Sequence, residues 1–143
     1  MDKLIKMLGG IEGAIAARLV EVAEIEVGLA ALEGDTCTGR EWWRDKNCPS
    51  KEVKLYINHS IDQACPLHGE PERGKRLRVY VGSDPANIAD AREAMECEVH
   101  RQELERRLRK LQNGLRNCGY SITRFYDYLG YDVQSDGQVR SRW

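Results

Sequence analysis

The chain has 143 residues, of which 41% are hydrophobic and 31% charged, and its formal net charge is −1. This length suits a single domain, and no apolar run approaches the about 20 residues that a membrane-spanning helix needs, so we do not expect a membrane protein. The first ten residues lack an apolar stretch followed by a small-residue cleavage site, which predicts no signal peptide and a cytoplasmic location. Five cysteines, an odd number, then favour thiols or metal ligands over a disulfide framework.

The near-zero total hides a separation of charge along the chain. Residues 12–33 carry a net charge of −4, and residues 100–117 carry +4. A local excess of one charge can attract an oppositely charged partner even when the net charge of the whole chain is near zero. Alternatively, the acidic and basic segments simply complement each other.

A first long helix is predicted over residues 1–33. From Leu4 to Leu32, apolar residues recur at alternating spacings of four and three, which is typical of a heptad seam. Three early glycines disfavour helix, so the first turns are expected to fray or to begin after Asp2. Gly34 is a typical C-terminal cap.

A second long helix is predicted over residues 87–117. Ser83-Asp84-Pro85 supplies a cap followed by a proline suited to a first helical turn, and Asn117-Cys118-Gly119 predicts the end. Beyond it, Ser121 can cap a short helix that places apolar residues on one face before a polar tail. These apolar residues are Ile122, Phe125, Tyr126 and Leu129.

Two heptad-bearing helices joined by an insert predict an antiparallel coiled-coil hairpin. Simple antiparallel pairing would set residues 21–33 beside residues 87–99, and both segments are acidic. Like charges facing each other are destabilising, so a staggered pairing or a homodimer is the alternative.

Residues 34–86, between the helices, predict a two-stranded β unit. Val53, Leu55 and Ile57 alternate with polar residues, and so do Leu77, Val79 and Val81. The fold prediction is therefore a single α+β domain: a helix (1–33), a Cys/His-containing β insert (34–86), a helix (87–117), and a short helix with a tail (118–143).

The insert contains four candidate metal ligands, Cys37, Cys48, Cys65 and His68. Zinc prefers four sulfur or nitrogen ligands in a tetrahedron, and Cys65-Pro-Leu-His68 supplies a closely spaced pair on a turn. Zinc would also hold the connection 59–74, which is long for an unsupported hairpin loop. The spacing of ten residues between Cys37 and Cys48 is wider than zinc ribbons use, so the alternative is small buried cysteines and a loop histidine.

The two predicted strands also carry a basic and aromatic face. Its members are Lys54, Tyr56, Arg73, Lys75, Arg76, Arg78 and Tyr80. Arginine neutralises phosphate, and its planar group, like tyrosine, can stack on a base, so the face predicts contact with nucleic acid. The alternatives are a solvated strand edge protected by charge, or an acidic protein partner.

Trp42 and Trp43 are adjacent and flanked by Arg40, Glu41 and Arg44. Both rings cannot point into one core from one short segment unless the backbone turns, so one is expected to be exposed. An exposed tryptophan beside arginine is typical of an interface anchor, whereas the alternative is a loop folded over the helices.

No catalytic motif is recognisable in the chain. His59-Ser60 with Asp62 is the only compact polar trio, and sequence neighbours seldom form a working triad. The prediction is a non-enzymatic binding module that assists or regulates a nucleic-acid transaction. The alternative is a protein-interaction adaptor or phage-type inhibitor that uses Trp42, Trp43 and the charged helix faces.

Two short motifs carry a resemblance to a known group of proteins. They are Cys65-Pro-Leu-His68-Gly69 and Gly74-Lys75-Arg76-Leu77-Arg78-Val79-Tyr80-Val81-Gly82, followed by a long charged helix. Together, over about residues 65–112, they resemble small bacterial proteins associated with transposable and phage elements. The sequence departs from that group at Gly69-Glu70-Pro71, where the group continues with proline and aromatic residues. The resemblance implies a mobile-element or phage setting, without an assigned activity.

Overall fold

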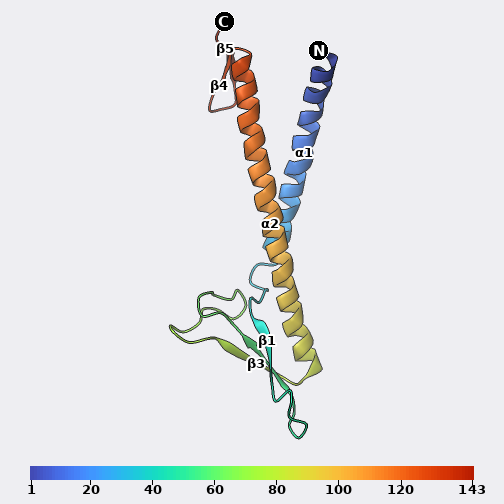
Figure 1. Cartoon of the computed structure of the whole chain (residues 1–143), viewed down its shortest axis with the longest axis vertical. Coiled ribbons are helices and arrows are strands. Elements are labelled where there is room, and N and C mark those ends of the chain that lie inside the picture. Colours follow the sequence, from blue (N-terminus) through green and yellow to red (C-terminus); the bar gives the residue numbers. More distant parts are fainter. The chain divides into compact units, whose positions relative to one another are not determined.

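The structure is a computed structural model that describes all 143 residues, and it is an α+β protein. It contains two helices, a three-stranded antiparallel sheet and a two-stranded one (Figure 1). The elements are α1 (Asp2–Ala31), β1 (Arg40–Arg44), β2 (Lys54–Asn58), β3 (Arg78–Gly82), α2 (Pro85–Tyr128), β4 (Tyr131–Val133) and β5 (Val139–Ser141). Neither helix is long and apolar enough to cross a membrane.

The chain divides into two compact units. The helical unit comprises Met1–Glu26 and Arg106–Trp143, and the sheet unit comprises Val27–Glu105. Both helices therefore contribute residues to both units. Each unit is described by itself below.

Helix α1 confirms the first predicted helix. It begins at Asp2, without the predicted delay, and the turn after it contains Gly34 at φ 81°, as expected of a cap. The predicted seam is only partly covered: Ile11 and Ile15 are half-buried, whereas Leu8 is exposed.

Helix α2 is longer than the sequence predicts. It begins as expected, because Asp84 Oδ1 accepts a hydrogen bond from the Ala86 N–H at 3.0 Å, but it then continues through Gly119 to Tyr128. The predicted end at Gly119 and the predicted separate C-terminal helix are therefore wrong. The physical reason is the spacing of the apolar residues, which stay four and three apart across Gly119, so one continuous helix keeps them on one face. These residues are Leu111, Leu115, Cys118, Ile122 and Phe125.

The predicted polar tail contains a second sheet instead. Strands β4 and β5 pair antiparallel, and Gly137 turns the chain between them at φ 84°. The hairpin is attached to the end of α2, because the Arg142 N–H donates to the Gly130 carbonyl at 2.9 Å and its guanidinium donates to the Asp127 carbonyl at 2.8 Å.

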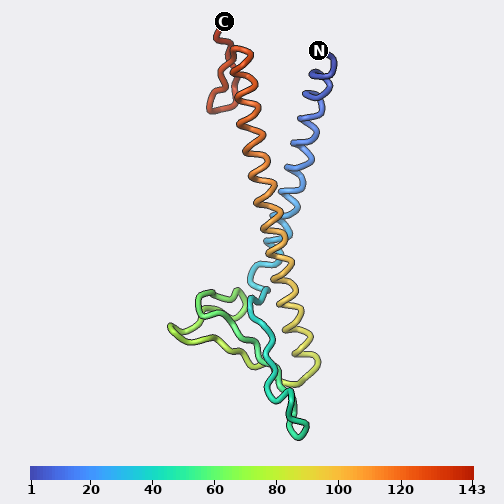
Figure 2. The backbone as a smooth tube through the Cα atoms, in the orientation of Figure 1, coloured from blue at the N-terminus to red at the C-terminus, as the bar shows by residue number.

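The β insert is a three-stranded sheet in the order β1-β2-β3. Strands β2 and β3 correspond to the two predicted strands, and β1, which the sequence did not predict, pairs antiparallel with β2. The inner face of the sheet packs on the first turns of α2, where Ile57 clusters with Cys37, Cys65 and Ala94. Figure 2 traces the connection between β2 and β3 as a long excursion that leaves the sheet and returns to it.

Candidate metal centre and outer sheet face

Four potential ligands, Cys37, His59, Cys65 and His68, come together beside the inner face of the sheet. Cys37 lies between α1 and β1, and its N–H donates to the Ala94 carbonyl of α2 at 3.0 Å. Its thiol is 1% exposed and accepts a hydrogen bond from the Gly39 N–H at 3.4 Å. A Cβ at position 39 would clash with Ile57 and come within 3.0 Å of His59 Nε2, so glycine is required for this close approach.

His59 reaches the group because it continues the alternation of β2. Leu55, Ile57 and His59 are all buried, so they share the inward side of one strand and its end. The His59 Nδ1 lies 3.2 Å from the Leu77 carbonyl and serves as the donor there. This bond fixes the tautomer and leaves the Nε2 lone pair directed at Cys37 and His68, as in metal-binding histidines.

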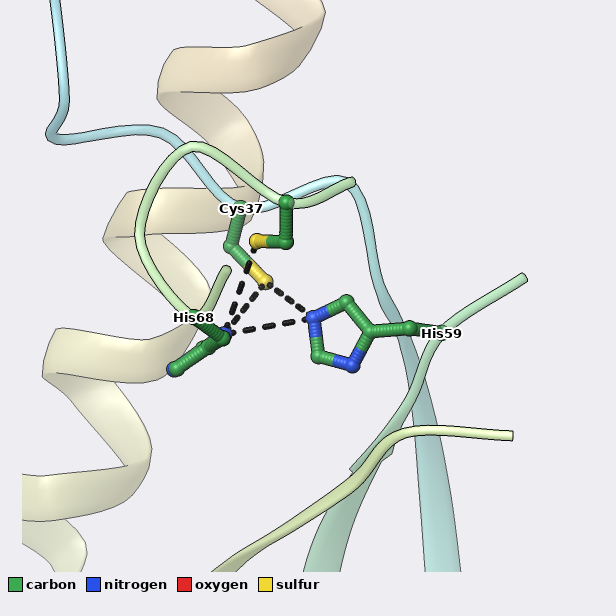
Figure 3. Close-up of side chains that lie close together, drawn as sticks. Cys37, His59 and His68 are labelled. Atoms are coloured by element: carbon green, nitrogen blue, oxygen red, sulfur yellow. Dashed lines mark hydrogen bonds between the residues drawn. The ribbon is translucent and has the colours of Figure 1, made fainter. Parts of the chain in front are cut away.

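Cys65 and His68 sit on a tight turn. Cys65 and Gly69 exchange two backbone hydrogen bonds, each of 2.8 Å, and Gly69 closes the turn at φ 86°. The Leu67 N–H donates to the Thr36 carbonyl at 3.1 Å, which ties the turn to the segment that carries Cys37. Figure 3 shows the side chains of Cys37, His59 and His68 pointing toward one another.

Four of the six distances between the ligand atoms fit the edges of a zinc tetrahedron. His59 Nε2 and His68 Nδ1 are 3.2 Å apart, and Cys37 Sγ lies 3.5 Å from the former and 3.6 Å from the latter. Cys65 Sγ lies 3.6 Å from His68 Nδ1, and all four ligand atoms fall within 4.8 Å of one another. Zinc bonds of about 2.3 Å to sulfur and about 2.0 Å to nitrogen give edges of about 3.5 Å for sulfur to nitrogen and about 3.3 Å for nitrogen to nitrogen. The four side chains are therefore close enough to bind an ion such as zinc.

Burial and backbone hydrogen bonds shift the pKa values of Cys37, Cys65 and His68. Burial raises the pKa of the Cys37 thiol to about 11, because the thiolate is disfavoured away from water. Burial opposes ionisation of Cys65 as well, but the N–H groups of Thr38, His68 and Leu67 outweigh it and lower its pKa. Burial, together with neighbouring His59, also lowers the pKa of His68, which keeps its imidazole neutral. Neutral imidazoles and thiols that can lose a proton to a cation are the chemistry of a Cys₂His₂ zinc site.

Three of the four predicted ligands belong to this group, and Cys48 does not. Cys48 lies in the turn after β1, where its sulfur is 3.5 Å from the Ser50 hydroxyl. His59 takes the fourth position, although the sequence placed it only in a polar trio with Ser60 and Asp62. The alternation of Leu55, Ile57 and His59 is the sequence signal that could have identified it.

The outer face of the three-stranded sheet carries a row of aromatic rings. The register pairs Trp42 with Tyr56 and Tyr56 with Tyr80, so the row takes one ring from each strand. The ring centroids are 5.5 Å and 5.2 Å apart, with the planes tilted by 60° and 59°. Trp42 is 38% exposed and Tyr80 is 58% exposed, so both ends of the row are accessible.

Basic side chains flank the aromatic row on both sides. Arg40 and Arg78 pair with Asn58 on one side, and Arg44 pairs with Lys54 on the other. The Arg78 guanidinium lies 4.6 Å over the Trp42 ring, and its Nε donates to Asn58 Oδ1 at 3.0 Å. The outward residues of the three strands thus contain four cations and no acid. We call these side chains the outer face, which comprises Arg40, Trp42, Arg44, Lys54, Tyr56, Asn58, Arg78 and Tyr80.

Trp42 and Trp43 point to opposite sides of β1, which confirms the expectation that one of them is exposed. Trp43 is half-buried on the inner side, and its Nε1 donates to Glu41 Oε2 at 3.2 Å. Glu41 in turn accepts a bond of 2.6 Å from Arg92 of α2, whose guanidinium lies 5.9 Å from the Trp43 ring. Trp43 therefore attaches the edge strand to the helix.

Three of the predicted basic residues fall outside the outer face. Arg73, Lys75 and Arg76 lie in the loop that precedes β3, and the Lys75 ammonium is 3.4 Å from Glu72. The structure places the predicted face residues Lys54, Tyr56, Arg78 and Tyr80 on one side of the sheet, and Trp42, which the sequence treated separately, lies beside them. It adds Arg40 and Arg44, which the sequence missed because it gave no strand to β1.

The chain was also compared with known proteins. No family model, curated protein or solved structure matches it.

Proposed function

We propose that the protein is a zinc-stabilised nucleic-acid-binding module that assists or regulates a nucleic-acid transaction without catalysing a reaction itself. The observation that carries this proposal is the outer face, where an aromatic row lies between basic side chains with no acid among them. Phosphate groups are neutralised by arginine and lysine, and base faces stack on aromatic rings. The combination favours nucleic acid, because one ligand would use both the rings, through its bases, and the cations, through its phosphates.

Zinc would supply the stability that the small sheet lacks. Leu55 and Ile57 are the only fully buried aliphatic side chains of the sheet, and few buried residues surround them. Domains with so small a core usually need an additional cross-link, and a structural zinc ion is one such cross-link. Bound at Cys37, His59, Cys65 and His68, it would join the segment before β1, the end of β2 and the long β2–β3 connection.

The binding proposal is tested by titrating fluorescein-labelled DNA and RNA oligonucleotides with the zinc-loaded protein at several salt concentrations. Arg40→Ala with Lys54→Ala removes two outer-face cations that have no ion-pair partner. Its matched control, Lys3→Ala with Lys6→Ala, removes two exposed cations from the start of α1. We expect the outer-face variant to bind more weakly and to lose about one to two units of the slope of log K against log salt.

The control variant should bind as the unchanged protein does. Equal binding by both double variants would contradict the proposal, and so would the absence of salt-dependent binding by the unchanged protein. A salt-insensitive partner that depends on Trp42 would favour the alternative function, a protein-interaction adaptor. Trp43 contributes less to that alternative, because it is held between Glu41 and Arg92.

We further infer that the helices supply assembly, as an antiparallel coiled coil within one chain or between two copies. The ion pair between Glu21 and Arg107 supports such a pairing, as do the half-buried seam residues Ile15 and Leu115. The free thiols and the absence of any disulfide fit a reducing compartment such as the cytoplasm. The resemblance of residues 65–112 adds a mobile-element or phage setting to this proposal.

A further inference from the structure

We infer that the outer face binds single-stranded nucleic acid, with unpaired bases stacked on the aromatic row. This inference rests on the proposed function and narrows it to one class of ligand. It follows from the accessibility of the ring faces, since phosphate contact alone would need only the basic side chains.

The aromatic row is suited to bases that are not already stacked. In a duplex, the faces of the bases are covered by their neighbours, so ring faces on a protein surface have nothing to stack against. A single strand can splay its bases, and each base has a π-face that any aromatic side chain can contact. A row of rings that is exposed at Tyr80 and in part at Trp42 would be of little use to a duplex-binding protein.

Tyr80 is the principal platform of the row. It is the most exposed of the three rings, and Gly82 beneath it leaves room for the ring, with the position of a Cβ only 3.3 Å from the Tyr80 hydroxyl. Trp42 is less available, because the Arg78 guanidinium covers its ring at 4.6 Å. Tyr56 lies between the two and is half-buried.

The basic side chains lie where the backbone of such a strand would pass. Arg40 and Arg78 are two residues along their strands from Trp42 and Tyr80, and Arg44 is two residues from Trp42 on the other side. Two residues along a strand span about 7 Å. A nucleic-acid strand that runs along the row would therefore have cations within reach of its phosphates on either side of its bases.

The test compares Tyr80→Ala with Tyr120→Ala, a matched tyrosine that is 68% exposed on α2 in the helical unit. Each zinc-loaded protein is titrated with labelled single-stranded oligothymidine, oligouridine and a DNA duplex of the same length. We expect Tyr80→Ala to weaken single-strand binding by about tenfold and to leave duplex binding unchanged, because stacking on one ring contributes about a factor of 5 to 150. Tyr80→Phe should keep the affinity, and Tyr120→Ala should bind as the unchanged protein does.

The outcomes separate this inference from the proposed function. If single strand and duplex bind equally and Tyr80→Ala weakens neither, the stacking inference is overturned while nucleic-acid binding stands. If no nucleic acid binds at all, both are overturned. Equal zinc content in Tyr80→Ala and the unchanged protein shows that the sheet unit has kept its fold.

Discussion

The sheet unit and the helical unit depend on different interactions. In the sheet unit, Leu55 and Ile57 are fully buried and four Cys and His ligand atoms lie within 4.8 Å of one another. In the helical unit, only Ile25 and Leu111 are buried among the helical residues that belong to that unit, and the remaining seam there is half-buried or exposed. The sheet unit should therefore fail when one group is removed, whereas the helical unit should tolerate single changes.

The ion pairs of the two units differ in the same way. Glu98 in the sheet unit is 3% exposed, and both of its oxygens accept bonds from Arg101, at 2.6 Å and 2.8 Å. Glu21 in the helical unit accepts two bonds from Arg107, at 2.6 Å and 3.1 Å, but both side chains are reached by water. Two such paired contacts with unequal burial predict unequal contributions to stability.

The largest expected effect is the loss of zinc from the sheet unit. Cys65→Ser removes one of the four proposed zinc ligands, and structural zinc in small domains contributes about 10 kcal/mol or more, comparable to the whole stability of a domain. We expect the variant to release zinc and to lose the near-ultraviolet circular dichroism of Trp42 and Trp43, while keeping most of its helical signal. Removal of the metal from the unchanged protein by a chelator should have the same result.

Cys48→Ser is the matched control, because Cys48 lies outside the ligand group. It should keep one zinc per chain in a colorimetric release measurement. If both serine variants kept zinc, or if both lost it, the claim that the sheet unit depends on this ligand group would be contradicted. The claim that the helical unit does not depend on zinc would be contradicted if zinc removal abolished the helical signal along with the near-ultraviolet signal.

The next largest effect is expected from loss of packing, which we compare at one leucine in each unit. Leu55→Ala in the fully buried core of the sheet should lower the free energy of unfolding by about 2 to 5 kcal/mol. Leu8→Ala, at a position 40% exposed in α1, should lower it by about 1 kcal/mol or less. Denaturant titrations of the zinc-loaded proteins measure both values. A cost at Leu8 as large as that at Leu55 would mean that a partner covers the start of α1.

The buried ion pair should make the sheet unit sensitive to acid. The Arg101 guanidinium, helped by Gln102, lowers the pKa of the Glu98 carboxyl to about 2 although burial opposes this, from an ordinary value of 4.5. Because the folded-state pKa is depressed, the stabilisation is complete above about pH 4.5 and is lost as the pH falls toward 2. We expect Glu98→Gln to cost on the order of 3 kcal/mol at pH 7. The difference from the unchanged protein should narrow below pH 4.5, and a difference that stays constant there would contradict the assignment.

Much of the fold could be predicted from local patterns. The spacing of four and three fixed α1 and the start of α2, and strict alternation predicted β2 and β3. The end of α2 was missed because Asn117-Cys118-Gly119 is a strong local signal for a helix end. The continued seam through Cys118 and Ile122 outweighs that signal, since packing on one face overrides single-residue propensity.

The metal group and the outer face could be predicted only in part. Cys37, Cys65 and His68 were identified by their chemistry, but His59 needed the register of β2, which places it inward. Strand β1 was missed because its sequence, Arg-Glu-Trp-Trp-Arg, places one tryptophan on each side of the strand. Alternation therefore cannot tell its inner face from its outer one. The register with β2 determines which side chains of β1 face outward. Local sequence patterns do not predict pairing between segments that are distant in the chain.

The smallest expected effect is at the exposed ion pair of the helical unit. Arg107, and after it Arg18, lowers the pKa of Glu21, so whatever stability the pair supplies is present above the ordinary pKa of a glutamate and is lost as the pH falls. Water screens this pair, and we expect Arg107→Gln to leave the denaturation midpoint unchanged within the error of the titration. Arg101→Gln, which removes the same charge from beside the buried carboxyl of Glu98 three residues away, should shift the midpoint clearly. If the two glutamine variants were equally destabilised, the helical unit would depend on its ion pair as the sheet unit does. The distinction between a unit held by a few buried groups and one held by many weak contacts would then be lost.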